Sequence, residues 1–363
     1  MEHYKIALSP GDTVGSELLS QARKVLAALA LRFGVNFDIL EIASCGPAID
    51  AYGTAFRDED IRAALECQAI LFGNIGDTGH TGHQPWETPV YALLSARQAF
   101  HVCTNIRPVY LLPELECLSP LKAELCRKGI DILIVRDLMG GMLNGEHYKA
   151  HLSSGWEASD LEYYNEEMVL HSALFAFRSA RQRRGRVTSV DKANILSSSK
   201  LWRGKVGGIH ALFSDVELVN DYVDHTAMEL LIHPYDYDVL LTSNVFGDIL
   251  ADEAAQITGT PWLFGSAELA KDNRGVYTPN QLHHPRGSEL AGKGEVSPYG
   301  ILDALQLLLR YSCGRQDMAD TLDGAIKSAL KDGLFTAEAR PPWGMLLSTD
   351  ELGDEIAKRI GET

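Results

Sequence analysis

The sequence lacks the features that mark membrane, secreted and zinc-binding proteins. It has no run of about 18 apolar residues, and its first segment, MEHYKIALSPGD, has neither the basic region nor the apolar core of a secretory signal. We therefore expect a cytoplasmic protein. None of its six cysteines forms a C-x-x-C pair or a zinc-type spacing. Their neighbours are largely apolar, so buried, reduced thiols are expected.

Positive charge is also scarce. The chain has 33 Lys and Arg against 49 Asp and Glu, a formal net charge of -16. Nucleic-acid binding needs a Lys/Arg surface, so no nucleic-acid partner is expected. The basic cluster at residues 181–186 follows a helical pattern, and we interpret it as a solvated helix end. An anionic substrate would have to be bound by arginines that the fold gathers locally.

The usual nucleotide-binding fingerprints are missing as well. Neither G-x-G-x-x-G nor a Walker A loop occurs. The first loop instead reads SPGDTVGSELL, with Gly11, Asp12 and Gly15 ahead of a helix. The start of that helix could accept an anion or a ribose, although such a loop is also an ordinary tight turn.

What is present is an alternation of strands and helices. At 363 residues and 45% hydrophobic composition, the chain can bury a large core, and two lobes are expected. No linker or repeat divides it, so the chain should cross between the lobes more than once. The alternation predicts the α/β class. The predicted strands include KIALS, AILFGNIG, ILIVR, VTSVDKANI and DVLLTSNVFG, and the predicted helices include residues 16–34 and 165–182.

Paired carboxylates follow the last of these strands. Asp248 and Asp252 come just after Gly247 and are four residues apart, so they share one helix face. They are either a solvated acidic helix start or two ligands of a hard cation such as Mg²⁺ or Mn²⁺. Asp224, in VNDYVDHTAMELL, is either a helix N-cap or a third ligand.

Basic side chains stand at other element ends. Lys192 follows an apolar strand, with Asn194 two residues later, and a lysine so placed can act as an acid or base or can simply be exposed. Arg97, Arg107 and Arg136 could form a bidentate clamp for carboxylates, or each could be a surface ion pair.

Together these segments resemble the β-decarboxylating dehydrogenases, the family of the 3-isopropylmalate, isocitrate, homoisocitrate, tartrate and D-malate dehydrogenases. The resemblance runs from PGDTVG near the start to ELAGKGEVSPYGILDALQLLLRYS near the end, and the isopropylmalate branch is the most similar. The order and spacing of seven residues match this family's site: Arg97, Arg107, Arg136, Lys192, Asp224, Asp248 and Asp252.

The resemblance implies a non-Rossmann, two-domain α/β fold with the site in the cleft between the lobes. Segments 1–102 and 259–363 would form a large cofactor-binding domain. Residues 103–258 would form a small domain that carries the dimer interface and the metal and substrate residues. The protein would be a homodimer with shared sites, in which Lys192 and Asp224 come from the partner subunit.

The resemblance also implies the roles of the site residues. The arginines would bind the carboxylates of a 2-hydroxy dicarboxylate, and Mg²⁺ or Mn²⁺ would be held by Asp224, Asp248 and Asp252. Lys192 would take the hydroxyl proton, with Asp224 beside it. A nicotinamide cofactor would accept the hydride.

The cofactor loop, YTPNQLHHPRGSELAGKG, departs from the isopropylmalate branch in length and in its Pro-Arg pair. Glu289 matches the acidic residue that binds the adenosine ribose, which favours NAD⁺ over NADP⁺ because a carboxylate repels a 2′-phosphate. Arg286 nearby leaves NADP⁺ open. The expected cofactor-binding residues are His284, Glu289, Leu290, Gly292 and Asn194.

A second departure lies after Arg136, where the family usually has a tyrosine that protonates the enolate. This chain reads MGGMLNG and has Leu143 in that place. Water or another side chain, with Tyr148 and His147 as candidates, would supply the proton, or the reaction would stop earlier.

A third departure concerns the substituent pocket. Val90 stands where the isopropylmalate branch has a glutamate, and Val90, Leu93 and Leu94 are spaced to line one helix face. Such a face is either core or a pocket for an apolar C3 substituent bulkier than isopropyl. The predicted function is therefore the NAD-dependent oxidation of a 3-substituted malate. The alternatives to this function are a D-malate, tartrate or isocitrate dehydrogenase, or a catalytically impaired paralogue that serves as a regulatory subunit.

Overall fold

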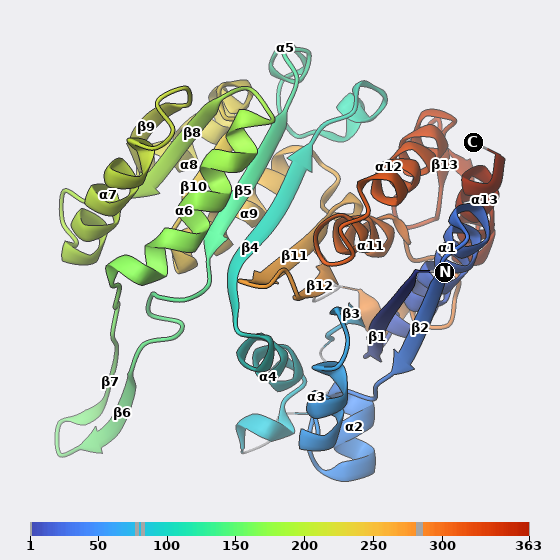
Figure 1. The fold of residues 1–363 in the computed structure, drawn as a ribbon, viewed down its shortest axis with the longest axis horizontal. Coiled ribbons are helices and arrows are strands. Elements are labelled where there is room, and N and C mark those ends of the chain that lie inside the picture. Colours follow the sequence, from blue (N-terminus) through green and yellow to red (C-terminus); the bar gives the residue numbers. More distant parts are fainter. Residues whose placement is uncertain (1, 77–79, 81–83, 281–285, 363) are drawn as a thin grey trace. The chain divides into compact units, whose positions relative to one another are not determined.

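The computed structural model describes residues 2–76, 80, 84–280 and 286–362 (Figure 1). The chain forms two compact units. Residues 1–102 and 260–363 make the first, so both chain ends belong to it, and residues 103–259 make the second. Parallel strands alternate with helices in both, and the predicted α/β class is confirmed.

The sheet of the first unit has the strand order β2-β1-β3-β12-β11. All of its neighbours pair in parallel except β11 and β12. Helix α1 packs on β1 and β3, and α11 packs on β11, β12 and β3. The elements are β1 (His3–Gly11), α1 (Gly15–Phe33), β2 (Asn36–Glu41), α2 (Cys45–Tyr52), α3 (Asp58–Ala64), β3 (Ala69–Asn74), α4 (Val90–Phe100), β11 (Gly265–Ala270), β12 (Gly275–Pro279), α10 (Gly287–Leu290), α11 (Tyr299–Tyr311), α12 (Gln316–Lys331), β13 (Leu334–Phe335), β14 (Met345–Leu346) and α13 (Thr349–Glu362).

The loop between β1 and α1 is hydrogen-bonded through Asp12 to the start of α2 and to the loop after β3. Asp12 is buried, and its carboxylate accepts hydrogen bonds from the backbone N–H groups of Gly46 (2.8 Å) and Gly76 (3.1 Å). At Gly15 a side chain would collide with the backbone of Pro10. Two backbone donors thus satisfy Asp12 within the unit, and the loop is a tight turn. Binding of an anion or a ribose at the start of α1 stays a prediction.

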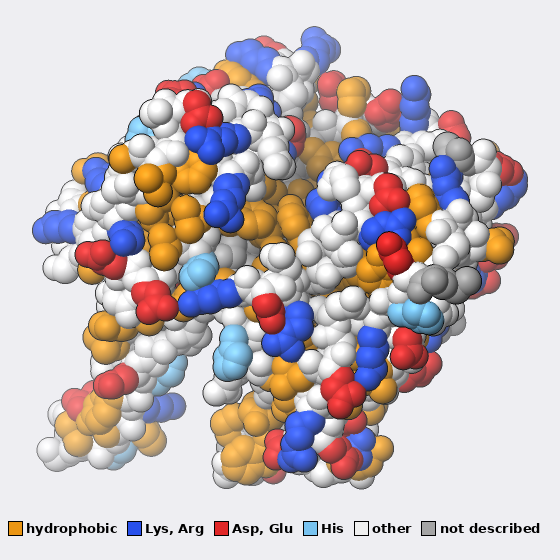
Figure 2. All heavy atoms as spheres, viewed as in Figure 1, with side chains coloured by type: hydrophobic (Ala, Val, Ile, Leu, Met, Phe, Trp, Pro, Cys, Tyr) orange, Lys and Arg blue, Asp and Glu red, His pale blue; other side chains and the backbone are white. Residues whose placement is uncertain are grey.

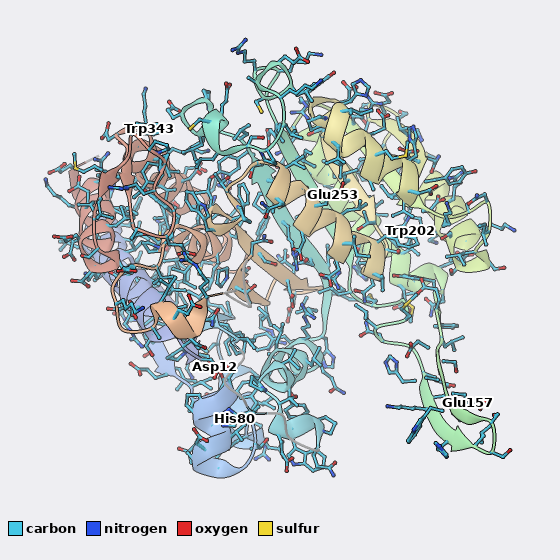
Figure 3. The ribbon with its side chains drawn as sticks, turned by 180° about the vertical axis from the view of Figure 1, so that it is seen from behind. Asp12, His80, Glu157, Trp202, Glu253 and Trp343 are labelled. Atoms are coloured by element: carbon cyan, nitrogen blue, oxygen red, sulfur yellow. The ribbon has the colours of Figure 1, made fainter. Side chains whose placement is uncertain are left out.

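The sheet of the second unit has the order β4-β5-β10-β8-β9, parallel except for β4 against β5. Helix α6 covers one face and α9 the other (Figures 1 and 3). Strand β10 is buried throughout, as expected for a parallel strand covered on both faces. The elements are β4 (Val102–Tyr110), α5 (Ala123–Cys126), β5 (Asp131–Asp137), β6 (His147–Leu152), β7 (Gly155–Asp160), α6 (Glu166–Arg181), β8 (Arg186–Asp191), α7 (Ser197–His210), β9 (Glu217–Tyr222), α8 (Val223–Ile232), β10 (Val239–Thr242) and α9 (Asn244–Ile257).

Trp202, a residue of α7, is part of the core of the second unit (Figure 3). It is 1% exposed, its indole N–H donates to Ser189 Oγ (3.0 Å), and its ring meets Tyr164 edge-on at 5.6 Å. The buried tryptophan therefore has its one polar atom satisfied.

The basic cluster at residues 181–186 is more than a solvated helix end. Arg183 Nε donates to Asp238 Oδ1 (2.8 Å), and Asp238 is 1% exposed. A buried carboxylate needs such a partner, so part of the cluster is structural.

The cysteines are free thiols that differ in exposure. All six cysteines lie in the described part, and none forms a disulfide. Four are buried, but Cys313 is partly exposed and Cys117 is exposed, so the expectation of buried thiols is wrong for these two. No helix within the described ranges has the length and apolarity needed to span a bilayer.

Candidate active site

Charged and polar side chains of the second unit lie where neighbouring parallel strands end. Arg136 closes β5, Asn244 follows β10, and Lys192 follows β8, and these three strands are adjacent in the sheet. The carboxyl ends of parallel strands meet at one edge, the usual place for a site in α/β proteins.

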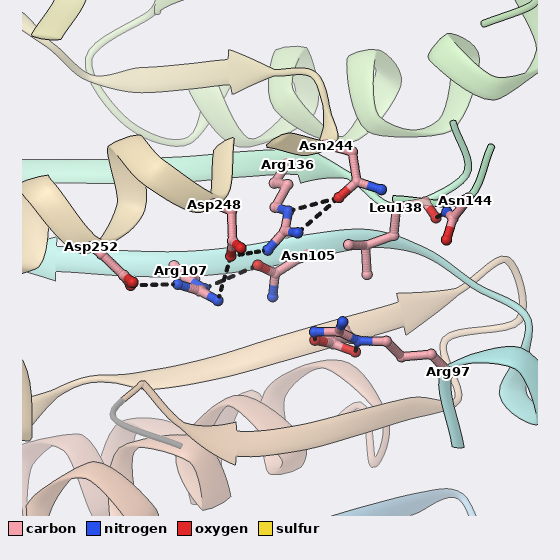
Figure 4. Close-up of polar contacts among 10 residues, drawn as sticks. Arg97, Asn105, Arg107, Arg136, Leu138, Asn144, Asn244, Asp248 and Asp252 are labelled. Carbon is pink, nitrogen blue, oxygen red and sulfur yellow. Dashed lines mark hydrogen bonds and ion pairs between the residues drawn. The ribbon is translucent and has the colours of Figure 1, made fainter. Parts of the chain in front are cut away.

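Arg136 is held from two sides. Its guanidinium donates through Nε (3.1 Å) and Nη2 (2.8 Å) to Asn244 Oδ1, and through Nη1 to Asp248 (Figure 4). The Asn244 amide donates in turn to Gly140 O (2.9 Å), and its backbone N–H donates to the Tyr164 hydroxyl (2.9 Å). Only 3% of the Arg136 side chain is exposed, so these contacts fix the orientation of its guanidinium group.

Arg107, from β4, joins the two paired carboxylates. Its Nη1 donates to Asp252 Oδ1 (2.9 Å), its Nη2 lies 3.4 Å from Asp248 Oδ1, and its Nε donates to Asn105 (3.1 Å) (Figure 4). Asp248 is thus shared by Arg107 and Arg136. Two carboxylates on one face of α9 meet two guanidinium groups, which compensates the repulsion expected between them.

Close packing sets the start of α9 against β5. A Cβ added at Gly247 would overlap the side chains of Thr242 and Arg136, with Arg136 Cγ only 2.7 Å away. Glycine is required immediately before Asp248 because the helix backbone touches the arginine stem there.

Lys192 and Asp224 pair with each other in the same unit. Lys192 Nζ donates to Asp224 Oδ1, and this hydrogen bond lowers the pKa of the Asp224 carboxyl. Asp224 lies in the first turn of α8 and Tyr222 occupies the N-cap position, so the N-cap interpretation of Asp224 is wrong.

The loop after β5 is held by two acids, of which Asp137 is buried and Glu162 is partly buried. Asp137 accepts from the N–H groups of Met139 (3.0 Å) and Gly140 (2.9 Å), and burial raises its pKa to about 7. Glu162 accepts from Met142 N (2.7 Å). Leu143 follows on this loop and is half exposed.

The two alternative proton donors lie on the hairpin β6–β7, each with a partner across it. The Tyr148 hydroxyl donates to Glu157 (2.8 Å), and His147 Nδ1 lies 2.6 Å from Asp160 Oδ1.

Arg97 is in the first unit, on α4, and its partner is Glu268 of β11. Arg97 Nε donates to Glu268 Oε2 (2.7 Å) and Nη2 donates to Oε1 (2.5 Å), a bidentate pair. Glu268 is 2% exposed. Each of the three predicted clamp arginines therefore holds a carboxylate of its own unit.

The apolar residues of α4 fall into two environments. Leu93 is 4% exposed and belongs to the core, whereas Val90 and Leu94 are exposed. Val90 and Leu94 are four residues apart and share a face, as expected, but the structure does not place Leu93 on it.

The expected cofactor-binding residues are spread over both units. Glu289 is exposed and Leu290 buried on α10, and Gly292 follows them. Asn194 lies exposed in the second unit, in the turn after β8. His284 lies outside the described residues.

Glu17 anchors the segment after α10. Its carboxylate accepts the backbone N–H of Gly292 and that of Gly294 (3.1 Å). Both glycines have positive φ, 75° and 66°, so this turn needs residues without a Cβ.

The three predicted metal carboxylates do not meet within one chain. Asp248 and Asp252 lie beside Arg107, while Asp224 pairs with Lys192. Across the described ranges, no group of three or more His, Cys, Asp and Glu side chains is arranged to hold a metal ion.

Four residues that make these contacts were not predicted from the sequence. Asn244 lies two residues after the buried strand β10, and Glu268 is the one charged residue in the strand GSAELA, so each had a signal in the sequence. Glu17 and Tyr164 carried none, because their partners lie far away in the sequence.

Guanidinium, carboxylate and ammonium groups at the carboxyl ends of parallel strands, without a Rossmann fingerprint, are typical of an α/β enzyme for small carboxylate substrates. The family model described as isocitrate/isopropylmalate dehydrogenase matches residues 5–356, and the chain belongs to this family. The family predicted from the motifs is confirmed, and with it the expectation of an oxidoreductase.

Relatives of known identity align along nearly the whole chain. The 3-isopropylmalate dehydrogenase of Yersinia pestis is 41% identical over 362 residues, covering 99% of this chain and 98% of the relative. That of Escherichia coli strain K12 is 39% identical over 363 residues and covers 99% of both.

Solved structures agree in fold. The isocitrate dehydrogenase of Methylococcus capsulatus superposes with a TM-score of 0.84 at 24% identity, covering 99% of both chains. A β-decarboxylating dehydrogenase of Thermococcus kodakarensis gives 0.75 at 25% identity, covering 99% of this chain and 96% of its own.

The Asn244 contacts give a stability prediction. Asn244→Ala removes the acceptor of two hydrogen bonds from buried Arg136 and the donor to Gly140, and should lower the free energy of unfolding by about 3 kcal/mol. Chemical denaturation followed by circular dichroism measures this. Asn194→Ala, at an exposed asparagine, is the control and should cost less than about 0.5 kcal/mol. A loss below about 1 kcal/mol for Asn244→Ala would contradict the assigned network.

Proposed function

We propose that the chain oxidises and decarboxylates a malate that carries a substituent on C3, using NAD⁺ and Mg²⁺ or Mn²⁺. The observation that carries this proposal is the group formed by Arg107, Arg136, Asp248 and Asp252 in a member of this family. It combines forked cations suited to a dicarboxylate with oxygen donors suited to a hard cation.

Arg97, Arg107 and Arg136 bind the substrate carboxylates in this proposal, and Lys192 accepts the proton of the C2 hydroxyl. A nicotinamide cofactor, held by the residues of α10 and the turn after it, would supply the hydride acceptor for the hydrogen on C2, and the substrate would become a 2-keto acid. The C3 carboxylate then leaves as CO₂, and its bonding electrons form an enolate that is protonated at C3. Leu143 has no proton to give, so water is our proposed donor.

The paired carboxylates fit a divalent cation. Asp248 and Asp252 offer oxygen donors, and their side chains are 46% and 72% exposed, so ligands can reach them. When a bound cation satisfies these carboxylates, Arg107 and Arg136 can exchange them for the carboxylates of a substrate. The cation supplies Lewis acidity for alcohol oxidation and for loss of CO₂.

The Asp248 carboxylate is central to this arrangement. Asp248→Asn should abolish Mn²⁺-dependent turnover and weaken Mn²⁺ binding measured by calorimetry by at least about tenfold, because one charged ligand is lost. Asp252→Asn should behave likewise. Glu253→Gln, on the same helix and with the same change of charge, should retain both properties. Near wild-type turnover of either aspartate variant in chelator-treated buffer would refute the metal assignment.

A homodimer would complete the site by bringing the partner's copies of two residues to it, and we propose that these are Lys192 and Asp224. Exposed apolar side chains of the second unit support an interface. The hairpin β6–β7 extends away from the sheet of the second unit (Figures 1 and 3). Its two strands pair only with each other and with no strand of that sheet. An isolated hairpin is marginal in water, so a covering partner would stabilise it.

Apolar surface also extends over this unit (Figure 2). The large exposed side chains on the hairpin and on α8 and α9 are Tyr148, Leu152, Trp156, Met228, Leu231, Ile232 and Ile249. Their number in one unit supports burial against a second copy.

We propose that α10 and its flanking turn bind the adenosine end of NAD⁺, together with His284, Leu290 and Gly292, and that Asn194 is a further cofactor-binding residue. Glu289 is exposed there, so its carboxylate is accessible to ribose hydroxyl groups. The anchoring of Gly292 and Gly294 by Glu17 supports a preformed loop.

Cofactor preference tests the role of Glu289. We expect kcat/KM for NAD⁺ to exceed that for NADP⁺ by at least tenfold, about 1.4 kcal/mol, because a carboxylate repels the 2′-phosphate. Glu289→Ala should narrow this ratio, while Glu295→Ala, an exposed glutamate in the following turn, should leave it unchanged. Equal use of both cofactors by the wild type would exclude this assignment.

The exposed pair Val90 and Leu94, with Leu143 in place of a hydroxyl-bearing residue, favours an apolar C3 substituent over a third carboxylate or a bare CH₂. We therefore propose a substrate at least as bulky as 3-isopropylmalate, such as a 3-alkyl- or 3-arylalkyl-malate. The same apolar surface argues against D-malate, tartrate and isocitrate as preferred substrates. The complete set of charged site residues argues against an impaired paralogue.

A substrate series with NAD⁺ and Mn²⁺, followed by absorbance of the reduced cofactor, tests the function. Each buried CH₂ contributes about 0.8 kcal/mol, so kcat/KM should rise from malate to isopropylmalate to benzylmalate, with the last step one to two orders of magnitude. Val90→Glu should flatten the series, whereas Leu31→Glu, an exposed leucine on α1, should not. A wild type that prefers malate or isocitrate, or turns over none of the series, would end the proposal.

A further inference from the structure

Glu268 is the one charged residue in the strand β11. Every residue of β11 is buried, and Glu268 itself is 2% exposed. Burial of a charged carboxylate is costly unless it is paired and hydrogen-bonded, and here the bidentate contact with Arg97 provides both.

This pair differs from the other arginine–carboxylate contacts. Asp248 and Asp252 stand on a helix face with 46% and 72% of their side chains exposed, so they can exchange an arginine for another cation. Glu268 is enclosed in a strand and has no comparable access to solvent. Its charge therefore remains assigned to Arg97, and the positive charge of Arg97 stays compensated.

Arg97 lies three residues after Leu94 on α4, on the adjoining part of the same helix surface. A group on C3 of the substrate that rests against Val90 and Leu94 would therefore lie next to the Arg97–Glu268 pair. A neutral ion pair tolerates an uncharged substituent. It offers a third carboxylate no net attraction, and the Glu268 carboxylate repels it.

We propose that Glu268 is a specificity-determining residue that restricts the substrate to 2-hydroxy dicarboxylates with an uncharged C3 substituent and excludes tricarboxylates. This inference rests on the proposed function. It assigns to Arg97 the role of a hydrogen-bond donor whose orientation and net charge are set by a buried partner.

The variant Glu268→Gln tests it, because glutamine keeps the size and one acceptor for Arg97 and removes the negative charge. With Mn²⁺ and NAD⁺, the kcat/KM ratio of isocitrate to 3-isopropylmalate should rise at least tenfold over the wild type. Asp272→Asn is the matched control. Asp272 pairs with Arg274 in the turn between β11 and β12, so this change alters net charge equally without touching Arg97, and the ratio should stay within twofold.

Calorimetric binding of isocitrate and of 3-isopropylmalate to the Mn²⁺-loaded protein gives the same ratio from dissociation constants, even where Glu268→Gln has lost turnover. A tenfold shift toward isocitrate in that ratio supports the proposal. A ratio within twofold of the wild type in a variant that keeps its circular dichroism spectrum overturns it. If Glu268→Gln does not fold, the double variant Arg97→Gln/Glu268→Gln replaces it. This double variant keeps the net charge of the pair at zero, so a shift toward isocitrate in it also overturns the proposal.

Failure of the proposed function gives a different result. Wild-type protein that oxidises no substituted malate refutes the function, whereas wild-type turnover of 3-isopropylmalate with an unchanged ratio in Glu268→Gln refutes only the role of Glu268.

Discussion

The arrangement of this protein's site depends on mutual neutralisation of arginine and carboxylate. Asp248 is shared by Arg107 and Arg136, Asp252 holds Arg107, and Glu268 holds Arg97. In a chain with a formal net charge of -16, the arginines are thus gathered and oriented by acids before any ligand is present. Preorganised charges of this kind spare a substrate the cost of ordering long side chains.

The sheets make this gathering possible. Adjacent parallel strands bring Arg136, Asn244 and Lys192 to one edge although they are far apart in the sequence. Helices on both faces bury the strands, and the close approach at Gly247 sets α9 directly against the Arg136 stem. The same backbone that forms the core therefore positions the charges. Asn244 connects the two functions, because it opens α9 and also holds Arg136.

Not all compensating carboxylates are alike. Asp248 and Asp252 are accessible to solvent, whereas Glu268 and Asp137 are buried and bound by local contacts. Burial raises the pKa of Asp137 to about 7, although two backbone N–H groups donate to its carboxylate and act in the opposite direction. In the proposed function, the accessible acids serve the binding of a cation and a substrate, and the enclosed Glu268 serves selection by charge.

The sequence by itself determined the α/β class and the family, and it predicted which charged residues form the site, because strand periodicity, Gly247 before an Asp pair and residue spacing are local signals. It also indicated an apolar face on α4, but could not separate buried Leu93 from exposed Val90 and Leu94, since spacing does not reveal what packs on each side. Only the tertiary structure decided which acid holds which arginine, that Asp224 pairs with Lys192, and that Glu17 anchors the turn at Gly292 and Gly294. These contacts join residues from distant parts of the chain, and only folding brings such partners together.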